Sequence, residues 1–389
     1  MRNIVLLIIA AVLANSCADT EQAKNSELAS TVLSVDVDQI ENVMDLTPYI
    51  DTITVVPLQE SDGGYLGSVD QMLFIHNHYV VLDRTLTFSA YVFDSEGKFV
   101  SDLIGIGKGP NEALQINTLW KDKSGNLQAL DYASRKVFSF DANFELIETM
   151  DYPDSRYLDV APIPNSEALV ASSAYNYFNS AGKETEHLLT VLNRRFEKQK
   201  GYLPIPDELK GAVVMMGDGN FFTYKNVLRF FKTFDNTIYT LDSLGQLDAE
   251  YKVQYSVNEL TTDLFQRLAL EAPERQVSFS TSPEVFTYSF FYSNWYENDS
   301  FASFYSIADS KKFFTLYDKG NAKVSSAYEL RVTTHDRLVE IPHLRFHDGQ
   351  AAYSVINTAS AGLETTELYK QVLRDFPEGS FVLLKVKFK

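Results

Sequence analysis

The sequence contains very little cysteine and comparatively few basic residues. Cys17 is the single cysteine among 389 residues, so no intrachain disulfide can form. Lysine and arginine together number 34 against 52 aspartates and glutamates, which gives a formal net charge of −18. A nucleic-acid backbone and an anionic bilayer surface would both repel such a chain, which excludes either as its main partner.

Long hydrophobic runs are also scarce. The clearest one covers residues 4–13 (IVLLIIAAVL) and follows the positive charge of Arg2. A helix of this length rises only about 15 Å, half of the roughly 30 Å that a hydrocarbon core requires. Residues 1–16 therefore predict a signal peptide rather than a membrane span.

The signal segment ends in residues 14–17 (ANSC), where small residues precede the cysteine. This pattern resembles a bacterial lipobox, whose cysteine becomes the lipidated first residue of the mature protein. We therefore expect lipidation at Cys17. Residues 17–45 are mostly polar and acidic, and they predict a lipidated N-terminus followed by a flexible tether. The alternative is an ordinary secretory signal in which the cysteine is incidental.

Proline is limited to 12 residues, whereas phenylalanine and tyrosine reach 27 and 22. Aromatic side chains suit a pleated, half-buried surface, so this composition favours β-structure. From Leu46 onward, short apolar or aromatic runs alternate with polar turns, which predicts meanders of short strands. The clearest strand candidates are residues 53–58, 71–75, 79–82, 90–93, 99–104, 117–121, 127–132, 136–140 and 146–150.

An aromatic residue or a leucine followed by Asp or Asn recurs where a strand ends and a turn opens. These pairs are Phe93-Asp94, Phe140-Asp141, Leu192-Asn193, Leu241-Asp242 and Tyr317-Asp318, at intervals of 47, 52, 49 and 76 residues. A period of about 50 residues with four strands each is typical of β-propeller blades. The longest interval contains residues 257–272, whose leucine spacing predicts a short helical insertion.

With a final repeat after these five, we expect an all-β fold: a six-bladed β-propeller with four-stranded antiparallel blades over residues 46–389. Ring closure requires one blade to be completed by strands from both ends of the chain. Residues 53–58 and 381–388 (FVLLKVKF) are expected to pair for this purpose. Each would otherwise be an unpaired sheet edge.

Residues 104–112 (IGIGKGPNE) follow a predicted strand and resemble the "IGrkGxGPgE" element of the six-bladed β-propeller lipoproteins of Bacteroidota. Those lipoproteins are related to the NHL and TolB-like propellers. Residues 234–251 and 46–58 are similar to a repeat and to the opening strand of the same family. Asn111 replaces the second glycine of the element, and asparagine tolerates left-handed backbone better than most residues. The resemblance implies a propeller and an outer-membrane lipoprotein, on the periplasmic side or at the cell surface. It implies no reaction.

The links between blades predict a ligand site. In a propeller, each link from an outer strand to the next inner strand opens on one face near the axis, and a rigid scaffold there can position polar groups for binding. The polar candidates for ligand contact at one mouth of the channel are Lys108, Asn111, Glu112, Arg156, Tyr224 and Lys225. The alternative is that these residues form salt bridges between blades.

The six histidines include two close pairs, His76 with His78 and His343 with His347. Pro342 and the β-like surroundings argue against the helical spacing that the second pair would need to bind a metal. We therefore predict neither a metal nor a cofactor. The sequence contains no GxSxG elbow and no HExxH motif, so catalytic residues remain unassigned.

Together these features favour a lipid-anchored binding or interaction module of the cell envelope, without enzymatic activity. Its partner would be a peptide, a glycan or an envelope protein, and it would contact the membrane through the lipid alone. One alternative is a propeller-fold glycan hydrolase or lyase with carboxylates at the channel mouth, because the many acidic residues could supply such a pair. Another is a purely structural role in an envelope assembly.

Overall fold

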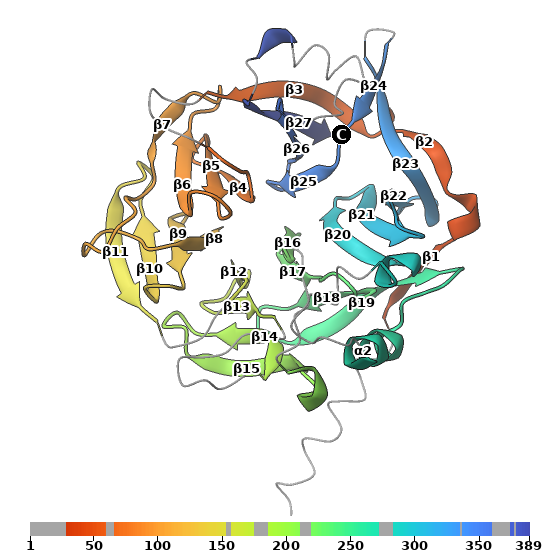
Figure 1. The fold of residues 1–389 in the computed structure, drawn as a ribbon, viewed down its shortest axis with the longest axis horizontal. Coiled ribbons are helices and arrows are strands. Elements are labelled where there is room, and N and C mark those ends of the chain that lie inside the picture. Colours follow the sequence, from red (N-terminus) through yellow and green to blue (C-terminus); the bar gives the residue numbers. More distant parts are fainter. Residues whose placement is uncertain are drawn as a thin grey trace, which may run out of the picture.

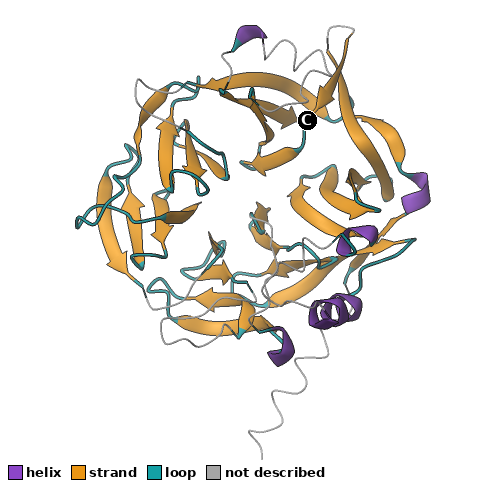
Figure 2. Ribbon diagram, viewed as in Figure 1, coloured by secondary structure: helices purple, strands orange, loops and turns teal. Residues whose placement is uncertain are grey.

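The computed structural model describes residues 29–59, 66–152, 157–174, 186–210, 219–271, 283–334, 337–359, 374–376 and 379–389. Six sheets, each built on four antiparallel strands, stand around a common axis (Figure 1), and strands dominate the described chain (Figure 2). This arrangement confirms the six-bladed β-propeller. None of the helices in the described ranges is long and apolar enough to cross a membrane.

Each blade begins with an inner strand beside the axis. Blade 1 contains β4 (Gln71–Ile75), β5 (His78–Asp83), β6 (Ser89–Phe93) and β7 (Phe99–Asp102). Blade 2 contains β8 (Ile116–Lys121), β9 (Leu127–Asp131), β10 (Lys136–Phe140) and β11 (Leu146–Asp151). Blade 3 contains β12 (Asp159–Pro162), β13 (Leu169–Ser172), β14 (His187–Leu192) and β15 (Lys198–Pro204).

The remaining three blades follow the same plan, with additions at the rim. Blade 4 contains β16 (Phe221–Tyr224), β17 (Val227–Phe230), β18 (Thr237–Leu241) and β19 (Leu247–Tyr255). Blade 5 contains β20 (Phe290–Glu297), β21 (Phe301–Ala308), β22 (Lys311–Asp318) and β23 (Lys323–Thr334), to which β24 (Arg337–Ile341) pairs. Blade 6 contains β25 (Leu344–His347), β26 (Ala351–Asn357), β27 (Phe381–Phe388) and β3 (Ile50–Leu58).

Antiparallel pairing divides the connections between two faces of the ring. In blades 1 to 5, the turn between the first and second strands and the turn between the third and fourth strands lie at the same end, on what we call the turn face. In blade 6, the first turn, the end of β27 and the start of β3 lie on this face. The links between blades and the turns between second and third strands lie at the opposite end, on what we call the link face. Hydrogen bonds join successive blades on the turn face, for example from His76 Nε2 to the Gly125 carbonyl oxygen, 2.8 Å apart.

The repeated Asp or Asn of the sequence closes the third turn of five blades. In each case the side-chain Oδ1 accepts two backbone N–H groups from the following residues, at distances from 2.8 to 3.1 Å. The residues concerned are Asp94, Asp141, Asn193, Asp242 and Asp318. Asp and Asn favour turns because their side chains bond their own backbone in this way. The repeated Asp or Asn therefore marks the turn in the sequence because its side chain stabilises that turn.

The predicted ring closure is confirmed. Strand β27 pairs antiparallel with β3 from Phe381 opposite Leu58 to Phe388 opposite Ile50. Strand β3 thus forms the outer edge of blade 6, beside the last strand of the chain (Figure 1). This pairing leaves neither of the two strands with the unsatisfied edge that an open ring would expose.

The prediction of a flexible tether up to residue 45 is wrong for its second half. Strand β1 (Thr31–Val35) pairs in parallel with β19 of blade 4, and β2 (Glu41–Asp45) pairs in parallel with β23 of blade 5. We call residues 31–45, including the 3₁₀ turn η1 (Val37–Gln39), the N-terminal strap. Leu33 and Val35 are almost fully buried, so alternate side chains of β1 enter the core. The strap makes blades 4 and 5 wider than the four strands expected.

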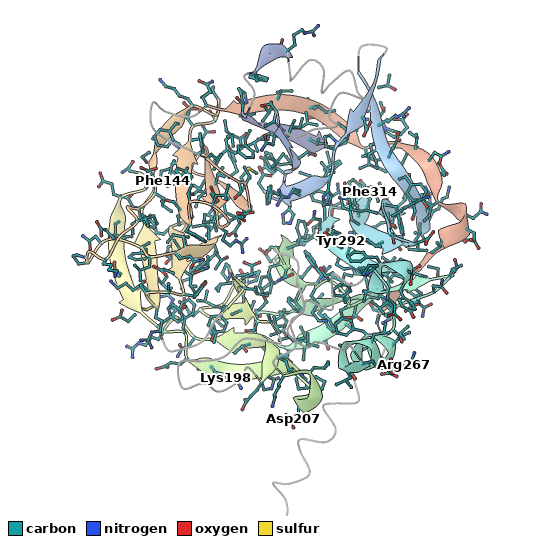
Figure 3. All side chains as sticks on the ribbon, in the orientation of Figure 1. Phe144, Lys198, Asp207, Arg267, Tyr292 and Phe314 are labelled. Carbon is teal, nitrogen blue, oxygen red and sulfur yellow. The ribbon has the colours of Figure 1, made fainter. Side chains whose placement is uncertain are left out.

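The predicted helical insertion is confirmed as α2 (Thr262–Glu271), in the link between blades 4 and 5. Phe265 and Leu268 face the core, where Phe265 stacks on Phe234 with ring centroids 5.4 Å apart. Two further 3₁₀ turns, η2 (Asp207–Leu209) and η4 (Val285–Thr287), pack in the same apolar cluster through Leu209 and Val285. Figure 3 shows Lys198, Asp207 and Arg267 at the outer rim, where all three side chains are exposed.

Candidate functional site

Three predicted ligand-binding residues, Lys108, Asn111 and Glu112, lie in the link between blades 1 and 2 and are exposed on the link face. The loop is held by its own backbone. The Gly107 N–H donates to the Ala113 carbonyl at 2.8 Å, and the Ala113 N–H donates to Gly105 at 3.0 Å. This local ladder presents Lys108 and Asn111 at its tip.

Glu112 is engaged within this loop. Its Oε2 accepts the Gly109 N–H at 2.6 Å. A Cβ atom at Gly107 would lie 2.0 Å from the same oxygen, so glycine is needed for the carboxylate to approach the backbone. Gly107 and Gly109 therefore permit the close approach of the carboxylate, and Glu112 stabilises the loop.

An apolar patch that the sequence did not predict lies on this loop and on a neighbouring turn of the same face. Its members are Leu86, Phe88, Ile106 and Leu114, with 56%, 39%, 46% and 38% of their surfaces exposed, and we call it the link-face patch. Leu86 and Phe88 come from the turn between β5 and β6, and the other two come from the link.

Backbone contacts bring the two segments of the patch together. The Phe88 carbonyl accepts the Ile116 N–H at 3.1 Å, and Ile106 forms an isolated bridge with Ala113. Phe88 itself has a φ of 58°, a left-handed conformation that is unusual for a bulky residue. Strained backbone of this kind persists where the surrounding structure imposes it, and it is concentrated at functional sites.

Two further predicted residues, Tyr224 and Lys225, do not lie with Lys108. Tyr224 ends β16, the inner strand of blade 4, and Lys225 opens the turn to β17, so both belong to the turn face. The prediction that they share one opening with the link residues is wrong, because they follow the inner strand instead of preceding it. Arg156 lies outside the described residues.

Tyr224 and Lys225 belong to a polar junction between blades 4 and 5. Both the Tyr224 hydroxyl and the Lys225 ammonium contact the Asp299 carboxylate. The Lys319 ammonium lies over the Tyr224 ring, 4.5 Å from its centroid. These contacts are the salt bridges between blades that the alternative interpretation described.

Beneath this surface, Glu297 is a buried carboxylate with four side-chain donors. Arg229 Nε lies 2.9 Å from Oε2, and Lys319 Nζ lies 2.8 Å from Oε1. The Tyr251 hydroxyl and the Trp295 indole N–H donate at 3.0 and 3.3 Å. Burial alone would raise the pKa of Glu297, but the bonds and charges of Arg229 and Lys319 outweigh it and lower that pKa below 4.5. A buried carboxylate whose oxygens accept this many hydrogen bonds is suited to a structural role between blades 4 and 5.

The histidines fall into two different settings. His76 and His78 hydrogen-bond to backbone carbonyls on the turn face. His347, on the inner strand of blade 6, packs edge-on against Phe222 of blade 4 with ring centroids 4.4 Å apart. Burial lowers the pKa of His347 to about 4. Within the described ranges, no three His, Cys, Asp or Glu side chains converge in a way that could hold a metal ion.

Comparison with known proteins supports the fold and the family. A family model described as Domain of unknown function (DUF4934) matches residues 31–365. A crystal structure of a protein from Bacteroides fragilis NCTC 9343, described as a candidate exported protein, is 15% identical with a TM-score of 0.72 and covers 92% of this chain and 100% of that one. A member of the DUF4221 family from Bacteroides vulgatus ATCC 8482 is 10% identical with a TM-score of 0.49, covering 87% and 97%. No curated protein matches the sequence.

Proposed function

The chain belongs to the DUF4934 family, and from this premise we propose that it is a lipid-anchored binding module of the cell envelope, with a peptide or protein partner that docks on the link face. The family description assigns no activity. The observation that carries the proposal is the link-face patch, where four large apolar side chains lie exposed on two loops of the face that also presents Lys108.

The patch suits a short peptide segment. Clusters of exposed apolar residues with a polar rim mark interaction surfaces in soluble proteins. Four side chains are few compared with the 20–30 residues a side of a standard protein interface, which favours a short docked segment over a broad interface. The exposed ammonium of Lys108 favours an acidic residue or a terminal carboxylate next to the apolar side chain of the partner.

Two observations support anchoring to the envelope: the residues around Cys17 and a protein of similar fold. The residues before Cys17 resemble the lipobox pattern, and a protein of similar fold is described as a candidate exported protein. We extend the proposal to an outer-membrane lipoprotein of the NHL or TolB-like group, as its motif resemblance suggests. Several acyl chains on one cysteine would hold it firmly, whereas a single chain binds only marginally.

A selection experiment tests the binding site. Peptides selected from a display library against the purified protein should carry an apolar residue next to an acidic one. The double variant Leu86→Ser/Ile106→Ser should weaken their binding at least tenfold, and Lys108→Ala should weaken the acidic peptides more than their amide counterparts. Leu244→Ser, which changes an even more exposed leucine on the turn face, is the control. If all variants bind alike, the patch is not the site.

A separate experiment tests the anchor. Wild-type protein should partition with membranes and carry a mass increment on Cys17, whereas Cys17→Ala should be soluble or remain an uncleaved precursor. Soluble wild-type protein with an unmodified Cys17 would refute the lipid anchor and leave the peptide site unaffected.

A further inference from the structure

A hollow of about 500 Å³ lies on the turn face of blade 3, away from the link-face patch. Its volume falls within the roughly 300–1,000 Å³ of ligand sites. Two turns form it, the one between β12 and β13 and the one between β14 and β15. Its lining residues are Ser166, Glu167, Ala168, Asn193, Arg194, Arg195, Glu197 and Gln199.

Comparison with the same turn in other blades shows that Arg194 and Arg195 are not needed to form the turn between β14 and β15. Asn193 closes this turn by accepting the N–H groups of Arg195 and Glu197, at 2.9 and 3.0 Å. The corresponding turns of the other blades make similar bonds with the residue pairs Ser95-Glu96, Ala142-Asn143, Ser243-Leu244 and Lys319-Gly320 in the same two positions. Blade 3 alone among these five turns has a pair of arginines, so another requirement accounts for them.

The arginines stand on a rigid base. Phe196, the next residue, is almost fully buried and has a left-handed φ of 61°. Its ring packs against Tyr152 and Trp120, with centroids 5.2 and 6.1 Å away. A turn pinned in this way holds its exposed side chains in place before a ligand arrives, which reduces the entropy lost on binding.

The charges around the hollow leave one cation available. Glu167 forms ion pairs with both Lys123, from the neighbouring blade 2, and Arg194. Glu197 accepts a hydrogen bond from the Asn193 amide at 2.6 Å. Arg195 is exposed in the same lining and has no ion pair among the residues that the structure describes. The lining itself carries Arg194 and Arg195 against Glu167 and Glu197, and Lys123 beside it adds a third cation, on a chain of net charge −18.

We propose that this hollow binds an acidic saccharide through the carboxylate of a uronic acid residue. Arg195 supplies a planar guanidinium that can bind a carboxylate with two parallel hydrogen bonds. Ser166 and Gln199 offer hydroxyl and amide groups to the sugar hydroxyls, as Glu167 and Glu197 offer acceptors. All the lining residues except Ala168 carry polar or charged side chains, which favours a ligand with many hydrogen-bonding groups over an apolar peptide. The site is independent of the peptide site on the opposite face.

Isothermal titration calorimetry with the purified protein tests the proposal. The probes are trimers of galacturonate and of mannuronate, the neutral galactose trimer, and a triglutamate peptide. At least one uronate trimer should bind while the galactose trimer does not, and Arg195→Ala should weaken binding tenfold or more. Leu244→Ala occupies the equivalent turn position in blade 4 and should leave the affinity unchanged.

Two results would overturn the inference. Failure of both uronate trimers to bind at millimolar concentration would remove the saccharide site. Equal, Arg195-dependent binding of the triglutamate peptide would show a site for acidic peptides instead. Circular dichroism of Arg195→Ala should match the wild type, because the turn bonds use only the backbone of this residue, and this separates lost affinity from lost structure.

Discussion

Arg229 of blade 4 and Glu297 of blade 5 form a buried ion pair, with Arg229 Nε 2.9 Å from Glu297 Oε2 and both side chains less than a tenth exposed. The pair links two neighbouring blades near the inner strands. Removing one partner of a buried ion pair destabilises a protein strongly, because a buried charge loses a partner. Replacing both partners with apolar residues costs far less.

We expect Arg229→Met to destabilise the protein by about 3–5 kcal/mol, because it removes one of the two cations that pair with the buried Glu297 carboxylate and leaves Lys319 as the other. The double variant Arg229→Met/Glu297→Leu should recover part of the loss. Urea denaturation monitored by tryptophan fluorescence gives both values, and Trp295 reports directly on the site. A double variant less stable than Arg229→Met would contradict this account.

The partly buried imidazole of His347 should make the ring sensitive to acid. Because burial lowers the pKa of His347 from 6.5 to about 4, the unfolded chain binds a proton more readily than the folded one between these values. The stabilising contribution is therefore complete above pH 6.5 and is lost as the pH falls toward 4. His347→Phe should reduce the loss of stability between pH 6.5 and 5. An imidazole that titrates near 6.5 in NMR spectra would rule out the explanation.

Ring closure predicts a strong dependence on β27. Leu384 is fully buried where β27 pairs with β26 and β3, so Leu384→Ala should cost about 2–5 kcal/mol. Lys387→Ala, on the same strand but exposed, should change stability far less. Deletion of residues 381–389 should abolish the cooperative thermal transition. A truncated protein that melts at the wild-type temperature would show that the ring does not depend on this strand.

The N-terminal strap should behave as part of the core. Leu33→Ala removes a fully buried side chain from β1 and should cost about 2–5 kcal/mol, whereas Val32→Ala, at 51% exposure on the same strand, should be close to neutral. Thermal denaturation of both variants provides the comparison. Equal melting temperatures for Leu33→Ala and Val32→Ala would indicate that residues 31–45 are a tether and not part of the core.

The link loop offers a test of coupling between Gly107 and Glu112. Gly107→Ala should displace the Glu112 carboxylate and so break its bond to the Gly109 N–H, which Glu112→Ala breaks directly. Each single variant should lose about 0.5–1.5 kcal/mol. The double variant should lose little more than either one, as a double-mutant cycle would measure. Additive losses would mean that the glycine serves another purpose.

The features that could be predicted from the sequence are those encoded by neighbouring residues. Strand β4 was expected at residues 71–75 and β10 at residues 136–140, with the observed bounds, because alternation and turn residues are local signals. The Asp or Asn after the third strand recurs because its side chain bonds backbone only two to four residues away. Repetition of these local units then specified a ring of six blades.

What remained undetermined depends on residues distant in the chain. The parallel pairing of Thr31 with Tyr251 joins segments 220 residues apart, and nothing near Thr31 announces it. Phe88 is exposed although aromatic residues are usually buried. Its exposure depends on how the turn between β5 and β6 meets the link between blades 1 and 2. Tyr224 and Lys225 lie on the turn face because they follow the inner strand β16. The prediction places them before the inner strand, which would be at the opposite end of the blade. Local rules therefore set the blades, whereas long-range packing decided which side chains face solvent and are available to bind.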